Sequence, residues 1–162
     1  MTGGTDHYDD RGLIPRSLSY IFEWIEQHSS EYSVSIRISY LEVYNDAGYD
    51  LLDPQHEHKS LTELPRVTLM ENDGAIHFRN LGELPASNVD EALNLLFVGE
   101  TNRIVCETPS NDASTRSHCI FMVNIETREL GGTKVRRSKL NLVDLVGTPI
   151  SALLASQPKL LE

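Results

Sequence analysis

The sequence predicts an α/β fold in which helices flank a β-sheet. Residues 15–28 carry apolar side chains at the i, i+3, i+4 and i+7 spacing of one helical face. Residues 32–45 instead alternate between apolar and polar side chains, as a half-buried strand does. Residues 119–127 and 135–145 predict two further strands, joined by a turn that contains two glycines. Helical and extended segments therefore share one chain, which is typical of the α/β class.

The first predicted helix has a start signal and one apolar stripe. Pro15 suits the first helical position, where its missing N–H costs no intrahelical hydrogen bond. The stripe consists of Leu18, Ile21, Phe22 and Ile25. Trp24 lies near the edge of this stripe, so we expect it to pack against the fold rather than to form a ligand platform.

The strand over residues 32–45 changes character along its length. Beyond Tyr40 both of its faces become apolar, so we expect the far end to be covered on both sides. Glu42 lies among these hydrophobic residues, and its environment favours a hydrogen-bonded strand carboxylate over a catalytic group. Asn45–Gly48 predicts the turn that ends this strand.

A loop and a small hairpin follow. Residues 53–65 predict an irregular loop in which His56 and His58 could suggest a metal pair, but no cysteine or second pair accompanies them. Residues 66–85 predict a hairpin, because Asp73 and Gly74 form a tight-turn signal between two apolar runs.

The longest predicted helix covers residues 88–104. Ser87 and Asn88 are alternative N-caps for it. The helix is apolar almost all round, so we expect burial on more than one side, including Leu93, Leu96 and Phe97.

Composition limits the classes of partner. The 162-residue chain has a net charge of −10, which argues against nucleic acid as a partner. The two cysteines favour a reduced intracellular setting. No apolar stretch reaches the roughly 20 residues of a membrane helix, and the polar N-terminus is no signal peptide, so we expect no membrane partner. The one basic run, residues 134–139, predicts a solvated hairpin end or, alternatively, a contact for an acidic partner.

Two segments form the candidate site. Residues 111–118 are a dense polar octet before the strand that starts near His118. Residues 141–147 form an apolar strand that ends in Asp144 and is followed by Gly147. A hairpin between the two strands would bring His118 and Asp144 to the same end of the sheet, where hydroxyls and a carboxylate suit Mg²⁺ and phosphate. The alternative for the octet is a polar loop that caps a helix end.

The same segments carry a family resemblance. Asn111–His118 resembles the switch I signature of kinesin motor domains, with Thr115 where a second serine is usual, and Leu142–Gly147 resembles the start of switch II. Three further matches follow the family's order: Arg11–Arg16, Ser39–Asn45 with Asp50–Asp53, and Gly99–Arg103. The sequence is most similar to the kinesin-9 branch, which is associated with cilia and flagella.

The resemblance implies an incomplete, kinesin-like P-loop NTPase fold with a mixed β-sheet. Residues 1–148 would be the central part of a motor domain. The sequence contains no Gly-x-x-x-x-Gly-Lys-Ser/Thr phosphate-binding loop. Residues 149–162 do not resemble the family and predict a weakly ordered tail.

The resemblance also implies roles around ATP and Mg²⁺. Thr115 and Asp144 would hold the metal, the latter through water. Ser114 would position the attacking water, so Ser114 and Arg116 are the candidate catalytic residues. The candidate nucleotide-binding residues are Asn111, Ser114, Thr115, Ser117 and Gly147.

The pattern breaks after Gly147. The family has Ser-Glu there, and the glutamate pairs with the switch I arginine, whereas this sequence has Thr148 and Pro149. Pro149 cannot accept a hydrogen bond from Arg116. We therefore predict that this chain alone is inactive as an ATPase and binds ATP and Mg²⁺ weakly or not at all.

The sequence thus predicts part of an ATP-dependent microtubule motor. The implied partner is tubulin, with weak contact here, and the implied location is the cytoplasm and cytoskeleton, including the cilium or flagellum. The alternative is a truncated, non-catalytic isoform that acts as an interaction or decoy protein. A GTPase is a third option, against which the octet argues.

Overall fold

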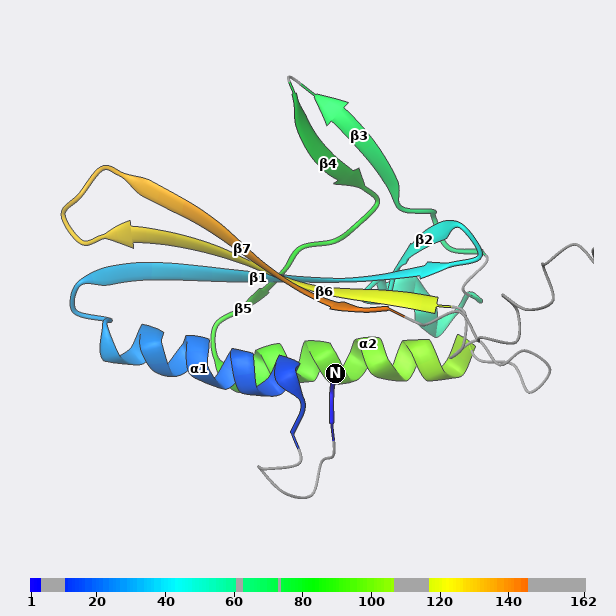
Figure 1. Ribbon diagram of the computed structural model, residues 1–162, viewed down its shortest axis with the longest axis horizontal. Coiled ribbons are helices and arrows are strands. Elements are labelled where there is room, and N and C mark those ends of the chain that lie inside the picture. Colours follow the sequence, from blue (N-terminus) through cyan, green and yellow to red (C-terminus); the bar gives the residue numbers. More distant parts are fainter. Residues whose placement is uncertain (4–10, 61–62, 73, 107–116, 146–162) are drawn as a thin grey trace, which may run out of the picture.

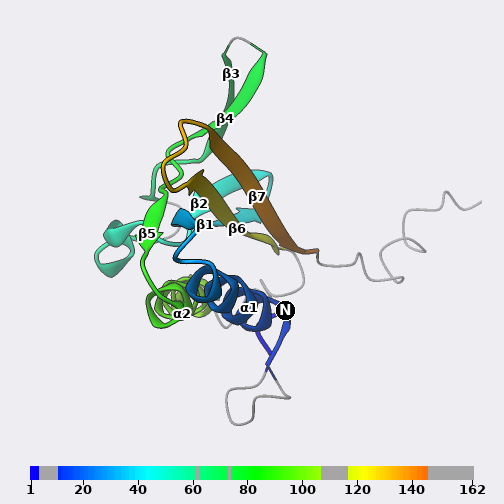
Figure 2. The same ribbon diagram turned by 90° about the vertical axis from the view of Figure 1, so that its left-hand side faces the viewer.

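The computed structural model describes residues 1–3, 11–60, 63–72, 74–106 and 117–145. In this part of the chain, two helices cover one face of a five-stranded sheet (Figure 1 and Figure 2). A separate two-stranded hairpin projects on the other side of the sheet. The expected α/β class is therefore confirmed.

The main sheet has the order β2-β1-β6-β7, and β5 also pairs with β1. Its strands are β1 Tyr32–Tyr44, β2 Ala47–Asp50, β5 Leu84–Ala86, β6 Ser117–Glu129 and β7 Val135–Asp144. Each described pairing is antiparallel, so the parallel part of the expected mixed sheet is not found among the described strands. Short turns join β1 to β2 and β6 to β7, and such turns can connect only antiparallel neighbours.

Helix α1, Leu13–Gln27, buries its N-terminal half against the sheet. Ile14 and Leu18 are 2% and 0% exposed. The helix begins two residues before Pro15, which corrects the expected start; the first helical turn tolerates proline because its N–H groups have no intrahelical acceptor. Trp24 is 36% exposed and stacks on His28, the residue after the helix, with ring centroids 4.2 Å apart. The ring therefore packs at the surface end of α1 and not in the core.

Helix α2, Val89–Cys106, begins with a side-chain cap. The Asn88 carboxamide oxygen accepts from the backbone N–H of Glu91 at 2.9 Å, so Asn88 is the cap and Ser87 precedes it. Leu96 is 6% exposed, but Phe97 is 70% exposed. The expectation that α2 is buried on more than one side is therefore wrong for the described residues. Among them, only the side of α2 that faces α1 and the sheet is buried.

Gly99 lets α2 lie close to β1. A Cβ atom at Gly99 would lie 2.2 Å from Cδ1 of Tyr40, well inside contact distance. The Tyr40 ring itself is held edge-on against Phe121, with centroids 5.2 Å apart. The glycine is thus required by the approach of a helix to a buried ring.

The core lies between the helices and the sheet. Its buried members are Ile14, Leu18, Ile36, Ile38, Tyr40, Leu51, Leu52, Ala86, Ala92, Leu96, Cys119, Phe121 and Val123. On the other face of the sheet, Leu41 and Met122 are 4% and 3% exposed. The far end of β1 is therefore covered on both faces, as expected.

The turn between β1 and β2 is tighter than predicted. Asn45 and Asp46 have φ values of 51° and 60°, and Ala47 already belongs to β2. Two consecutive left-handed residues are typical of the two-residue type I′ hairpin. The expected four-residue turn is therefore wrong, because asparagine and aspartate tolerate the left-handed conformation without glycine.

The predicted second hairpin is confirmed. It consists of β3, Thr68–Asn72, and β4, Ala75–Arg79, and Gly74 at its tip has a φ of 76°. The preceding segment contains a short 3₁₀ helix, Pro54–Glu57, where the sequence predicted only an irregular loop. The side chain of Asp53 caps this helix by accepting from the N–H of Gln55 at 2.8 Å.

We predict that Gly99→Ala destabilises the fold. Alanine favours a helix by about 1 kcal/mol over glycine, but overpacking against Tyr40 costs about 1–3 kcal/mol. Urea unfolding followed by Trp24 fluorescence should show a net loss of stability. The matched control is Asn94→Ala on the exposed side of α2, which should leave stability unchanged or slightly raised. Equal stability of Gly99→Ala and the parent would contradict the close approach of α2 to Tyr40.

Candidate functional site

The structure describes two of the predicted site residues, Ser117 and Asp144. Ser117 is the first residue of β6, and Asp144 is the last residue of β7. The strands pair antiparallel with Cys119 opposite Asp144, so the expected meeting of the two strand ends is confirmed. The remaining predicted positions, Asn111, Ser114, Thr115, Arg116 and Gly147, lie outside the described residues, and so do Thr148 and Pro149.

Ser117 and Asp144 differ in their surroundings. Ser117 is 1% exposed, and its hydroxyl has no hydrogen-bond partner within the described part of the chain. The Asp144 side chain is 46% exposed, and its Oδ2 lies 3.6 Å from the amino nitrogen of Met1. Asp144 is therefore an accessible carboxylate, which fits its predicted role toward Mg²⁺.

A cluster of polar side chains lies beside these strand ends, on the helix side of the sheet. Glu42 pairs across the strands with Cys119, and Glu42 is 3% exposed. The Tyr40 hydroxyl donates a hydrogen bond to the Glu100 carboxylate on α2. We call Tyr40, Glu42, Glu100, Arg103 and Cys119 the strand-end cluster.

The strand-end cluster borders the predicted metal ligand, Asp144. Arg103, Cys119 and Asp144 all line one small cavity of about 10 Å³, which is room for about one water molecule. No site role was predicted for Arg103 or Glu100 from the sequence. Their spacing of three on a helix places them on one face, but nothing local in the sequence indicated that this face meets β1 and β6.

Burial and neighbouring charges set the protonation states of the side chains in the strand-end cluster. Burial raises the pKa of Cys119 to about 12, and burial followed by the hydrogen bond with Glu100 raises the pKa of Tyr40. Burial alone would lower the pKa of Arg103, but Cys119, Glu100 and other neighbours raise it overall. The cluster therefore holds a charged guanidinium, a neutral phenol and a neutral thiol.

Asp50, the first residue of the Asp50–Asp53 match, has a structural role. It is 6% exposed and accepts hydrogen bonds from the N–H groups of Leu52 at 2.9 Å and Gly82 at 2.7 Å. Burial raises the pKa of Asp50, against the effect of these two hydrogen bonds. On α2, the Asn102 side chain donates to the carbonyl of Leu51 at 2.7 Å. These contacts are structural, since they tie the end of β2 to two distant segments.

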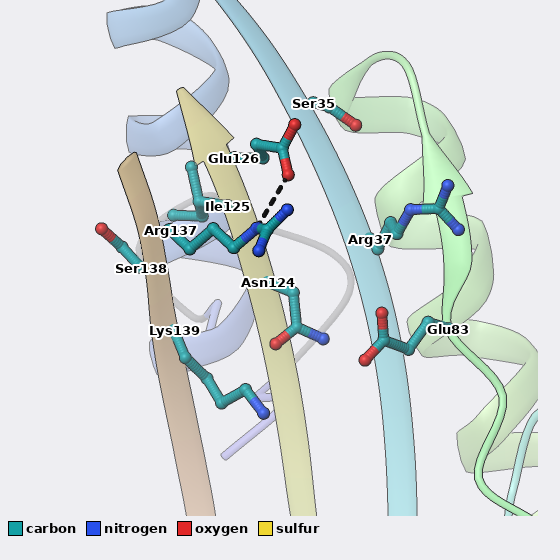
Figure 3. Close-up of a pocket in the computed structure, with 9 residues that line it drawn as sticks. All are labelled: Ser35, Arg37, Glu83, Asn124, Ile125, Glu126, Arg137, Ser138 and Lys139. Carbon is teal, nitrogen blue, oxygen red and sulfur yellow. Dashed lines mark hydrogen bonds and ion pairs between the residues drawn. The ribbon is translucent and has the colours of Figure 1, made fainter. Parts of the chain in front are cut away.

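A larger cavity lies elsewhere, over the strands of the main sheet (Figure 3). Its volume is about 450 Å³, and it is lined by charged side chains of both signs, among them Arg37, Glu83 and Lys139. Arg137 also lines it and donates to Glu126 at 3.1 Å. None of the predicted site residues lines this cavity, so its size does not make it the candidate site.

Other kinds of site receive no support in the described residues. His56 donates from Nε2 to the carbonyl of Asp50 at 2.9 Å, which gives this ring a structural role. No group of three potential metal-ligating His, Cys, Asp or Glu side chains is found among the residues that the structure describes. No described helix is long and apolar enough to cross a bilayer.

Comparison with known proteins decides the family. A model of the kinesin motor domain matches residues 1–152. The chain belongs to the kinesin motor family. Its fold agrees, because the structure of a fast kinesin superposes with a TM-score of 0.80 at 29% identity, over 99% of this chain and 44% of that one. The expected partial kinesin fold is therefore confirmed, and the chain is related to microtubule motors.

Individual relatives show how much of a kinesin this chain represents. It is 38% identical over 165 residues to Kinesin-like protein KIF9 of Mus musculus, covering 100% of this chain and 20% of the mouse protein. It is 39% identical over 151 residues to KIF9 of Homo sapiens, with coverage of 91% and 19%. For Kinesin-like protein KLP1 of Chlamydomonas reinhardtii the identity is 34% over 151 residues, with the same coverage. The KIF9 matches agree with the kinesin-9 resemblance, and this kinesin chain spans about a fifth of these relatives' length.

We predict a loss of stability in mild alkali that depends on Cys119. A pKa raised from 9.0 to about 12 means that the unfolded thiol ionises first. Stability should therefore be intact below pH 9 and fall above it, by at most about 1.4 kcal/mol per pH unit for this group. Urea unfolding at several pH values from about 8 to 10.5 measures this slope.

The matched variant is Cys119→Val, which removes the titrating group and keeps an apolar side chain. Its slope should be shallower than that of the parent, while the slope from Tyr40 remains. Identical slopes in the parent and Cys119→Val would show that the thiol is not buried in this way.

Proposed function

We propose that this chain is the central segment of an ATP-dependent microtubule motor, comprising residues 1–148, with residues 149–162 as a separate tail. The observation that carries the proposal is the register of β6 and β7, which sets Cys119 opposite Asp144. The last two residues of the octet, Ser117 and His118, begin β6, and Gly147 comes three residues after the end of β7 in the sequence. Both kinesin motifs therefore adjoin the same end of the sheet.

The proposed roles divide between metal, nucleotide and catalysis. Thr115 and Asp144 would hold Mg²⁺, and Ser114 and Arg116 would act in hydrolysis. The nucleotide would be bound by Asn111, Ser114, Thr115, Ser117 and Gly147. ATP supplies the phosphoryl group when bound, and the accessible Asp144 carboxylate is the described feature that fits a cation.

Partner and location follow from the family. The complete motor would move on microtubules in the cytoskeleton of the cytoplasm, and the kinesin-9 relationship favours a cilium or flagellum. Contact of this chain with tubulin would be weak at the β3–β4 hairpin. The sequence around the turn of this hairpin contains two acidic residues, Glu71 and Asp73, and negative charges there would be repelled by the acidic tubulin surface.

A second candidate is a non-catalytic isoform that acts through protein contacts. One observation favours it, since Thr148 and Pro149 replace the Ser-Glu that follows the glycine in the family.

We predict that the 162-residue chain binds ATP no tighter than about 1 mM, because the sequence has no loop whose backbone N–H groups would hold the β- and γ-phosphates. Titration with a fluorescent ATP analogue in the presence of Mg²⁺ should show no saturation below this concentration. Saturation at micromolar concentrations would contradict the predicted inactivity of the chain alone.

We predict that Asp144 is essential in a complete motor. In a chimera, residues 11–145 replace the matching stretch of the mouse KIF9 motor domain, and microtubule-stimulated ATPase activity is measured. Asp144→Asn should lower the rate at least about 100-fold, because it removes a charge beside the metal and the phosphates. The control Glu129→Gln makes the same chemical change at the far end of β6 and should leave the rate unaltered. A chimera that retains its activity with Asp144→Asn would contradict the proposed metal-binding role of Asp144.

A further inference from the structure

The strand-end cluster contains one cation, Arg103, and two carboxylates, Glu42 and Glu100. A third carboxylate, Asp144, borders the cluster through the small cavity that it lines together with Arg103. One guanidinium therefore lies near carboxylates from three different elements, β1, α2 and β7. The carboxylate that pairs with Arg103 determines whether Asp144 stays available for a metal ion.

Glu100 is the main anion that acts on Arg103. The two residues are three positions apart on α2, so they lie on one face of the helix. Burial lowers the pKa of Arg103, and four neighbours raise it, in decreasing order Cys119, Glu100, Tyr40 and Glu42. The raised pKa values of Cys119 and Tyr40 keep both groups neutral near pH 7. The glutamates therefore supply the negative charge, and Glu100 has the larger effect of the two.

The Glu100 carboxylate is itself fixed from β1. The Tyr40 hydroxyl donates a hydrogen bond to it, and Tyr40 is 2% exposed and packs edge-on against Phe121. Figure 1 shows the C-terminal half of α2 beneath the end of β1, where the backbone of Gly99 approaches the Tyr40 ring. A buried, tightly packed ring therefore holds Glu100 beside Arg103.

Arg103 and Asp144 line the same cavity of about 10 Å³, which has room for about one water molecule. The Nε atom of Arg103 is buried and has no hydrogen-bond partner among the described residues. Without the charge of Glu100, this guanidinium would gain from pairing with Asp144, because hydrogen bonds between ionised groups are the strong ones. A guanidinium at Asp144 would in turn repel Mg²⁺.

We propose that Glu100 is a positioning residue of the metal site, which holds Arg103 by its charge and so keeps the Asp144 carboxylate available for Mg²⁺. Glu100 acts through Arg103 and has no contact with the metal or the nucleotide. Removing its charge lets the guanidinium pair with Asp144 and compete with the metal. This inference rests on the proposed role of Asp144 as a metal ligand, and the tests below separate the two.

A double-mutant cycle on the 162-residue chain tests the pairing without metal or nucleotide. In the parent, Asp144→Asn should change the urea midpoint little, because Arg103 pairs with Glu100. In the Glu100→Gln background the same substitution should lower the midpoint more, because Arg103 then pairs with Asp144. The control Glu129→Gln removes a carboxylate at the far end of β6, and its effect should add to that of Asp144→Asn. Additive effects of Glu100→Gln and Asp144→Asn would overturn the proposal.

Tyr40→Phe provides a second cycle. This variant keeps the ring on Phe121 and removes the hydroxyl that holds Glu100. Its coupling with Asp144→Asn should have the same sign as that of Glu100→Gln and a smaller size. Where Glu100→Gln does not fold, this cycle decides the proposal, and additivity would overturn it.

The chimera described above tests the consequence for the metal. When it is loaded with a fluorescent ADP analogue, lowering the free Mg²⁺ concentration should speed nucleotide release, because the metal links the phosphates to the protein. Glu100→Gln should raise the Mg²⁺ concentration that half-suppresses release at least about fivefold, because Arg103 competes for Asp144. Glu100→Asp keeps the charge and should stay within about twofold of the parent. An unchanged Mg²⁺ dependence of Glu100→Gln would overturn the proposal.

Asp144→Asn in the same titration separates this proposal from the proposed function. If Asp144 holds Mg²⁺, this variant should shift the Mg²⁺ dependence more than Glu100→Gln does. A shift in Asp144→Asn without one in Glu100→Gln would overturn the role of Glu100 alone. The absence of a shift in Asp144→Asn would overturn the metal role of Asp144 and, with it, the role of Glu100 toward the metal.

Discussion

The pairing of β1 with β6 is the constraint on which the rest of this kinesin segment depends. It joins Tyr32–Tyr44 to Ser117–Glu129 along the full 13 residues of each strand, although the strands are far apart in the sequence. Both helices pack on the face that these strands create. The pairing also fixes where residue 117 begins its strand, and β7 then brings Asp144 to the same end. Long-range strand pairing of this kind costs loop-closure entropy, which the buried core must offset.

The strand-end cluster shows how the helix side of the sheet supports the candidate site. Tyr40 and Glu42 come from β1, Glu100 and Arg103 from α2, and Cys119 from β6. A buried carboxylate such as Glu42 is tolerated where a cation lies near it, and the charge of Glu42 in turn raises the pKa of Arg103. The cluster thus links the position of α2 to the strand ends that carry the kinesin motifs.

Local patterns in the sequence predicted the elements of the fold, but not how they meet. Apolar periodicity identified α1, β1, β6 and β7 because each has one face on the core. The same reasoning failed for Phe97, since periodicity cannot tell which apolar faces find a partner. The Tyr40–Glu100 hydrogen bond spans 60 positions, so no local pattern could indicate it. The joining of the two strand ends was predictable because one short turn enforces it, whereas the roles of Ser114, Thr115, Arg116 and Gly147 stay predictions.

The β3–β4 hairpin has a consequence for how this protein can be altered. Outside its own two strands, the structure records one backbone bridge from this region to the main sheet, between Gly48 and Val67. Leu69 and Phe78 face each other across the hairpin and remain 67% and 37% exposed. A two-stranded hairpin gains little from its own packing. The hairpin is therefore structurally independent of the sheet, so its length and surface can change while the sheet beneath keeps its geometry.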